Sequence, residues 1–200
     1  CRHATGEIIF LSDQDDRWHE DKIARVLGVF SNPEIVLLNS NARLIDGEGR
    51  ALGETLFDRL RIDDRERQAL MQGDLARVGT YKNLFTGATM AFRRSLLDSA
   101  LPFSMQVHHD DWLAQVAWIV GGDIQTLFDP LMDYRLHATN TIGLGSFEGS
   151  LACASPSERL SAYLESQERR LEPVVERGNA LAARGNASTS RLNVRQRQLE

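Results

Sequence analysis

Short apolar runs alternate with amphipathic stretches along most of the chain. The run Ile8–Leu11 and a second run within Glu34–Ser40 have the length and composition of buried strands. Between them, apolar residues recur at helical spacing over Trp18–Phe30, and Phe85–Phe92 predicts a further strand that is entered through Gly87. This alternation predicts an α/β layered domain in which Ile8–Leu11 is an interior strand.

The later elements follow the same alternation. Residues 54–78 are charged and weakly periodic, which predicts one or two surface helices, and residues 93–102 predict a short helix that stops near Pro102. The clearest helix covers residues 108–120 and ends at Gly121. Residues 123–137 predict two strands separated by a turn at Asp129–Pro130.

The character of the sequence changes after residue 150. Apolar residues at helical spacing predict helices over residues 157–183, interrupted near Pro173, with Leu160 and Leu164 covered by the domain or, alternatively, by a membrane surface. The segment after Gly185 is too polar to hold a core, which predicts disorder. We therefore divide the chain into a domain, residues 1–150, and a helical extension with a disordered end, residues 151–200.

Composition narrows the class of protein. A hydrophobic content of 42% is ordinary for a globular domain, and a net charge of −5 argues against a nucleic-acid partner. No stretch approaches the roughly 18–20 apolar residues that span a bilayer, and no signal peptide is recognisable. The two cysteines suggest neither a disulfide framework nor a metal site. A cytoplasmic location is expected, with the inner face of the plasma membrane as the alternative.

A cluster of acidic residues follows the first apolar run directly. Asp13, Asp15 and Asp16 lie where the strand should end, and carboxylates that close repel one another unless water or a cation separates them. One interpretation is a solvated turn that caps the next helix, because Asp is favoured there. The other is a Mg²⁺ or Mn²⁺ site, because these ions are held by one or two carboxylates together with substrate phosphates.

Two other metal-dependent chemistries do not match the spacing. An EF-hand loop beginning at Asp13 needs Gly at its sixth position and Glu at its twelfth, where Trp18 and Ala24 stand. An aspartyl-nucleophile phosphohydrolase usually has an apolar residue before its first Asp and Thr or Val four residues after it, where Ser12 and Arg17 stand. The phosphohydrolase is therefore kept only as a lesser alternative.

Four segments together resemble a known enzyme family. FLSDQDDRW, LFTGATMAFRRSLL, HHDDWLA and YRLHATN occur in the order and with the spacing of family 2 glycosyltransferases, most of all the bacterial rhamnosyltransferase-like branch. The resemblance covers residues 4–145. It implies the GT-A fold, here present in part. It also implies inverting transfer of a sugar from a nucleoside-diphosphate donor to a polysaccharide or lipid-linked acceptor, with Mg²⁺ or Mn²⁺ as cofactor.

The resemblance also assigns roles to residues of these motifs. It places Asp13 at the ribose of the donor and Asp15 at the metal that bridges the diphosphate. Asp110 matches the acidic position that serves as catalytic base, and His137 matches a further contact to the metal or the diphosphate. Gly87 would border the sugar and acceptor pocket, where a residue without a side chain lets the backbone come close.

Other members of the motifs are expected to be structural, namely Asp16, Trp18, Trp112 and Asn140. Asp110 and Asp111 open a helix, where a carboxylate is stabilised by the helix dipole. Without the resemblance, Asp110 would be interpreted as a helix cap. Asp111 is expected only to help cap this helix, a contribution of about 1 kcal/mol.

Two departures from the family keep another function open. Asn41 stands where many relatives have Asp. The opening strand of the family and its Asp-Asp-x-Ser-x-Asp region, which hold the nucleotide base, would precede Cys1, so we expect the chain to be a fragment. A non-catalytic remnant or binding module of the same fold is therefore the alternative to an enzyme.

Overall fold

A computed structural model describes residues 3–74, 84–136 and 156–197, with the backbone alone over 156–164 and 166–167. Its strands are β1 (Ile8–Phe10), β2 (Arg17–Trp18), β3 (Ile35–Ile45), β4 (Ala51–Thr55), β5 (Met90–Arg93) and β6 (Asp123–Arg135). Its helices are α1 (Lys22–Val29), α2 (Leu56–Arg59), α3 (Asp64–Met71), α5 (Leu96–Ala100), α6 (His109–Ile119), α8 (Pro156–Ala182) and α9 (Thr189–Arg197), with a short 3-10 helix η1 (Gly87–Thr89).

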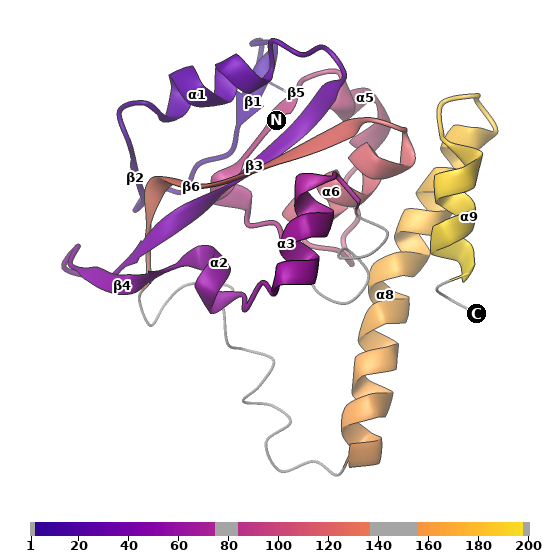
Figure 1. The fold of residues 1–200 in the computed structure, drawn as a ribbon. Helices are drawn as coiled ribbons and strands as arrows, with labels where there is room; N and C mark the ends of the chain where they lie inside the picture. The colour runs from indigo at the N-terminus through magenta and orange to yellow at the C-terminus, as the bar shows by residue number, and fades with distance from the viewer. Residues whose placement is uncertain (1–2, 75–83, 137–155, 198–200) are drawn as a thin grey trace.

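The strands form one mixed sheet with helices on both faces (Figure 1). The strand order is β1-β5-β3-β6-β2, and β4 pairs with β3 outside this path. The pairing of β3 with β6 is parallel, and the other pairings are antiparallel. Helix α1 covers one face, and α3 and α6 cover the other (Figure 1). Helices α8 and α9 pack against α6. The predicted α/β layering is therefore confirmed.

Strand β3 is central because both of its faces are apolar. Leu37 and Leu38 have 0% of their surface exposed. Neighbouring residues of a strand point to opposite faces, so Leu37 joins the cluster around Val116 of α6 while Leu38 joins the cluster around Val26 of α1. The helices α2, α3 and α5 lie where the pattern predicted them, and α6 ends before Gly121, whose φ of 88° suits glycine.

Strand β1 is not the interior strand that the sequence predicted. Among the described strands it pairs with β5 alone and lies at an end of the sheet. Its faces are covered by other means, because Ile9 packs against the core and the ring of Phe10 lies 5.5 Å from the ring of Trp18. An apolar run thus indicates that both faces of a strand are covered. It does not indicate that both edges of the strand pair with other strands.

A single strand, β6, replaces the two strands that were expected around Asp129–Pro130. The register of β6 against β3 is irregular at Asn41, whose partner is Pro130. Proline has no N–H to give to the sheet, and a bulge is one of the places where a strand accepts it. The proline therefore marks a bulge within one strand, and the prediction of a turn was wrong.

The C-terminal segment is more helical than its sequence suggested. Helix α8 runs through Pro173 without the predicted interruption, and Leu171 and Val174 beside the proline are fully buried. This packing against the domain offsets the backbone hydrogen bond that proline removes. After Gly185, where the composition predicted disorder, α9 forms with Leu192 buried. Its contacts with α6 and α8 hold this helix in place although its composition is polar.

Two further expectations on this segment remain predictions. The side chains of Leu160 and Leu164 lie outside those that the structure describes, and so does the division of the chain near residue 150. Across residues 3–74, 84–136 and 156–197, no helix has the length and apolar character needed to cross a membrane.

Candidate active site

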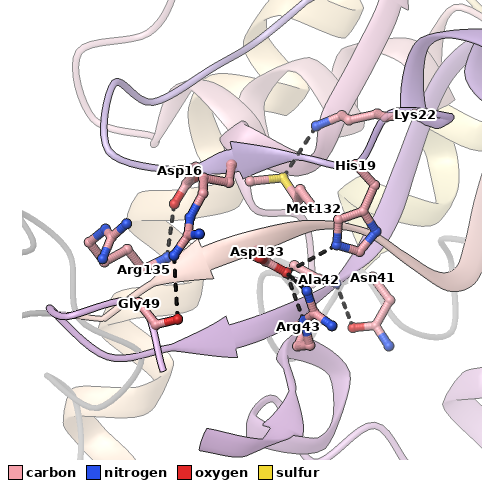
Figure 2. A network of polar contacts seen from close by, with 11 residues as sticks. Asp16, His19, Lys22, Asn41, Ala42, Arg43, Gly49, Met132, Asp133 and Arg135 are labelled. Carbon is pink, nitrogen blue, oxygen red and sulfur yellow. Dashed lines mark hydrogen bonds and ion pairs between the residues drawn. The ribbon is translucent and has the colours of Figure 1, made fainter. Parts of the chain in front are cut away.

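The carboxylate loop, residues 12–16, joins β1 to β2 and is fixed by the end of β6 (Figure 2). Oδ1 of Asp16 accepts the backbone N–H of Arg135 at 2.9 Å. The Arg135 guanidinium in turn donates to the backbone oxygens of Asp15, at 2.9 Å, and of Gly47, at 2.8 Å. Asp16 therefore anchors the loop, while Asp13 is exposed and Asp15 is half-buried.

The loop concentrates negative charge. Burial raises the pKa of the Asp16 carboxyl to about 6, and the carboxylates of Asp15 and Asp13 act in the same direction. The N–H of Arg135 and the charge of Lys22 lower this pKa without cancelling the rise. Oδ2 of Asp16 is buried, and no described group forms a hydrogen bond with it. A bound cation would relieve this accumulation of charge.

The oxygen donors of the carboxylate loop fit Mg²⁺ or Mn²⁺, which bind a few carboxylates and keep several waters. In the part of the chain that the structure describes, no group of three or more His, Cys, Asp or Glu side chains is arranged to hold a metal ion. His137 and Asn140 lie outside the described residues. Among the described residues, the loop by itself therefore does not form a complete metal site.

Lys22 lies behind the loop as a cation with 1% of its surface exposed. Its Nζ donates to the backbone oxygen of Ala88 at 3.1 Å and to Sδ of Met132 at 3.2 Å, and it lies 4.3 Å from the centre of the Trp18 ring. Burial lowers the pKa of Lys22 to about 8, although the charge of Asp16 opposes this shift. Lys22 thus joins the start of α1 to η1 and β6.

We expect the free energy of unfolding to depend on pH through Lys22. Its native pKa of about 8 lies below its ordinary value of 10.5. Above the ordinary pKa, the amine is neutral in both the folded and the unfolded state, and its contribution to the free energy of unfolding is fully present. This contribution is lost as the pH falls through the native pKa, because the amine must then be charged in its buried position. Wild type should therefore gain stability relative to Lys22→Met between about pH 8 and pH 10. Urea unfolding of both proteins measures this difference.

The same two proteins compared between about pH 6 and pH 7 serve as the control, because Lys22 is charged in both the folded and the unfolded state there. Any change in the difference over that range comes from Asp16, whose pKa of about 6 is lowered by the charge of Lys22, and not from titration of Lys22 itself. A difference that stays constant above pH 8 would contradict a lowered pKa for Lys22.

Asp133 ties β6 to β3 and to His19, the residue that follows β2 (Figure 2). Burial alone would raise the pKa of Asp133, but hydrogen bonds from His19, at 3.0 Å, and from Arg43, at 2.8 Å, hold it below its ordinary value. Asn41 fastens the bulge of β6, because its Nδ2 donates to the backbone oxygen of Phe128 at 3.1 Å. A carboxylate at this position has no N–H to donate, so Asn41 acts here through the group that distinguishes it from Asp.

Asp110 lies in the first turn of α6 beside Gly87. Its Oδ2 accepts the backbone N–H of Gly87 at 3.2 Å, and its Oδ1 accepts the N–H of Asp111 at 2.7 Å. A Cβ at Gly87 would lie 2.7 Å from Nε2 of His109, the end of an exposed side chain that can move aside. The structure brings Gly87 and Asp110 together through the hydrogen bond between them.

The residues before and after the carboxylate loop bind the same short segment. The N–H of Leu11, just before the loop, donates to the backbone oxygen of Met90 at 3.1 Å, and Lys22 binds that of Ala88. Residues 87–90 are thus bound both to the chain around the loop and to Asp110. The motifs FLSDQDDRW, LFTGATMAFRRSLL and HHDDWLA therefore meet around η1. The fourth motif, YRLHATN, begins at the end of β6, where Arg135 is bound to the carboxylate loop.

Asp111 is not the simple helix cap that the sequence predicted. It is 3% exposed, and its carboxylate accepts two hydrogen bonds from the guanidinium of Arg170 on α8. A partner 59 residues away cannot be read from a helix-entry pattern. Trp112 is also buried, and its indole N–H donates to the backbone oxygen of Ala100 at 2.8 Å, so the expected structural role of Trp112 is confirmed.

The sequence pattern missed Lys22, Arg135 and Arg170 as parts of this region. For Lys22 a signal existed, because it shares a helix face with Val26, and a charged residue on a core-facing position needs an explanation. Arg135 stands inside one of the recognised motifs. Arg170 lies in a helix whose sequence resembles an ordinary solvated surface, and nothing in its neighbours distinguishes it.

Comparisons with known proteins agree with this arrangement at the level of the fold. No family model matches the chain. A curated glycosyltransferase of Nostoc sp. (strain PCC 7120 / SAG 25.82 / UTEX 2576), itself uncharacterised, is 24% identical over 140 residues, which cover 68% of this chain and 42% of the relative. The chain thus spans less than half the length of this relative.

Two solved structures are also similar. Residues 1–349 of TarS from S. aureus, in complex with UDP-GlcNAc, match 99% of this chain and 48% of that one, with 16% identity and a TM-score of 0.50. The mannosyltransferase PcManGT from Pyrobaculum calidifontis, in complex with GDP-Man and Mn²⁺, matches 96% of this chain and 55% of that one, with 17% identity and a TM-score of 0.45. The likeness to TarS confirms the fold that the motifs implied: a mixed α/β sheet that matches the GT-A glycosyltransferases.

Proposed function

We propose that the protein is a glycosyltransferase that moves a sugar from a nucleoside-diphosphate donor to a hydroxyl of a glycan or lipid-linked acceptor, with inversion. One observation carries this proposal. Leu11 and Lys22, which lie before and after the carboxylate loop, and Asp110 all bind the segment around η1, in a fold that matches GT-A glycosyltransferases. In open α/β sheets, ligands bind beyond the ends of strands, which is where these groups lie.

The carboxylate loop would receive the donor. Asp15 would bind a Mg²⁺ or Mn²⁺ ion held jointly with the diphosphate, and Asp13 would contact the ribose. A divalent cation at this place supplies charge to the departing diphosphate. The anchoring of Asp16 on Arg135 keeps the backbone of the loop fixed while its charge is neutralised.

Asp110 would act as the base. Its carboxylate accepts the proton of the acceptor hydroxyl as the oxygen attacks the anomeric carbon on the face opposite the diphosphate. The backbone N–H of Gly87 orients this carboxylate. His137, as a further contact to the metal or diphosphate, belongs to the same proposal.

The resemblance of the motifs extends the proposal to rhamnose as the sugar and a surface polysaccharide as the product. One assay distinguishes the enzyme from the alternative, a non-catalytic remnant of the same fold. Full-length protein is incubated with a panel of nucleoside-diphosphate sugars and Mn²⁺, and release of the nucleoside diphosphate is measured with and without acceptor glycans. A remnant binds a donor and releases nothing.

Replacing Asp15 by Asn is expected to weaken Mn²⁺-dependent binding of the donor by at least about tenfold, because a charged ligand of the metal is lost. A higher Mn²⁺ concentration should restore part of the affinity by mass action. Calorimetric titration of the full-length protein with the donor, at several Mn²⁺ concentrations, measures both effects.

Asp21→Asn is a matched control, since Asp21 is an exposed carboxylate at the start of α1, outside the loop. This variant should bind donor as wild type does. If Asp15→Asn binds the donor as tightly as the control at every Mn²⁺ concentration, Asp15 is not a ligand of the metal.

A further inference from the structure

A buried ion pair joins the C-terminal helix α8 to the first turn of α6. The Arg170 guanidinium donates two hydrogen bonds to the carboxylate of Asp111, one of them at 2.8 Å from Nη2 to Oδ1. The side chains of Arg170 and Asp111 are 13% and 4% exposed. Nε2 of Gln115, one turn further along α6, donates to the same Oδ1 at 3.2 Å. The Asp111 carboxylate is therefore held in one orientation.

A second arginine completes the contact between the domain and the C-terminal helices. Arg195 of α9 is 0% exposed and lies 4.4 Å from the centre of the Trp118 ring of α6. Burial lowers the pKa of Arg195 to about 10, and the charge of Arg170 adds to this shift, while Asp111 and Asp74 oppose it. Arg195 therefore stays charged at neutral pH.

Helix α9 also holds the other end of α6. The N–H of Ser188 donates to the backbone oxygen of Ile119 at 2.8 Å, and the Arg191 guanidinium donates to the backbone oxygen of Trp118 at 3.0 Å. Carbonyl groups at the end of a helix lack partners within the helix, so these bonds cap α6. The helix is thus fixed at its first turn by α8 and at its last turn by α9.

We propose that Arg170 is a positioning residue for Asp110, a role that rests on the proposed function. Asp110 and Asp111 are adjacent in one helical turn, so their side chains leave the helix in different directions, Asp110 toward Gly87 and Asp111 toward α8. A rotation of the first turn that moved Asp110 away from η1 would break the two-pronged contact of Asp111 with Arg170. The orientation of the base is therefore set by the C-terminal helix.

Stability alone does not explain why the pair is ionic. Two buried charges lose their hydration, and an apolar pair of similar volume joins two helices at least as well. The fork of an arginine on a carboxylate instead fixes direction, because two parallel hydrogen bonds form in one relative orientation. A directional contact one residue away from the proposed base is what orientation of that base requires.

The test uses Arg170→Met and Arg170→Lys in the full-length protein, with Arg169→Met as control. Arg169 is the neighbour of Arg170 on the same helix, is exposed, and donates to the backbone oxygen of Glu165 within α8. Arg170→Met should lower kcat by about tenfold, because a small misplacement of a reacting group is costly, while the KM for the donor changes little. Arg170→Lys keeps one charged hydrogen bond and should recover part of kcat. Arg169→Met should retain the kcat of wild type.

A second readout does not depend on transferase activity. Hydrogen exchange of the backbone amides of Trp112 and Leu113 reports local opening of the first turn of α6, and it should be about tenfold faster in Arg170→Met than in Arg169→Met. Equal exchange and equal kcat in these two variants would overturn the inference. If Arg170→Met does not fold, Arg170→Lys decides by the same two measurements. If wild type transfers no sugar, the proposed function fails, and the exchange rates still decide whether Arg170 holds this turn.

Discussion

Asp110→Asn is expected to lower the turnover number of sugar transfer by about 10²–10⁴, the contribution of a positioned general base. Asn keeps the size of Asp, and its one carbonyl oxygen can still accept the N–H of Gly87, while the bond from the N–H of Asp111 is lost. Asn cannot take the proton of the acceptor hydroxyl. Donor affinity should therefore remain within a factor of about two, because the loop that binds the donor is untouched.

Initial rates at saturating donor and acceptor, together with a binding titration of the donor, measure the two quantities in full-length protein. Asp98→Asn is the matched control, because Asp98 is an exposed carboxylate in the first turn of the neighbouring helix α5. It should transfer sugar at the wild-type rate. Wild-type turnover in Asp110→Asn would exclude Asp110 as the base, and the carboxylates of the loop would then be the next candidates.

Asp111→Asn is expected to lower the free energy of unfolding by about 3 kcal/mol, because it leaves the charge of Arg170 buried without its carboxylate. The helix-cap interpretation of the sequence predicts a loss of only about 1 kcal/mol. A measurement of stability thus distinguishes the two interpretations of Asp111. An activity assay alone does not, because unfolding of Asp111→Asn and loss of the base in Asp110→Asn both lower activity. Any assay of Asp111→Asn must be normalised to the folded fraction of the protein.

Urea unfolding followed by circular dichroism measures this loss. Asp64→Asn is a suitable control, since Asp64 lies in the first turn of α3 and is exposed. It should cost about 1 kcal/mol or less, the usual size of a charge effect at an exposed helix start. Equal losses for Asp64→Asn and Asp111→Asn would show that the ion pair with Arg170 adds nothing to stability.

The sequence pattern predicted best the elements that are both apolar and local. Helix α6 and the strands β1 and β3 could be located because their residues repeat at the period of the structure. The single strand β6 and the short helix α9 were missed for opposite reasons. Pro130 looked like a turn but lies in a bulge, while the polar residues around Leu192 concealed a helix that contacts with α6 and α8 hold in place.

The residues of the candidate site also differ in how far the sequence could predict them. Asp13, Asp15, Gly87, Asp110 and His137 could be proposed because they belong to recognisable motifs, and the structure shows Gly87 and Asp110 in contact. The partner of Asp111 could not be foreseen, because an ion pair depends on how α8 returns to the domain and not on any local pattern. The same holds for the contact of Lys22 with Ala88, residues that are 66 positions apart in the sequence.

The parallel pairing of β3 with β6 determines when the molecule can fold. Asn39 of β3 and Thr126 of β6 are hydrogen-bonded across 87 positions of sequence, so the central pair of strands closes late and at a high cost in loop entropy. During synthesis, β3 emerges as an apolar strand long before β6 can cover its edge, which is a state prone to association with other chains. The carboxylate loop is likewise synthesised long before Arg135, the residue that anchors it and lies 119 positions later in the sequence. Folding of this chain should therefore be slow, and its acidic loop acquires a fixed shape only in the final steps.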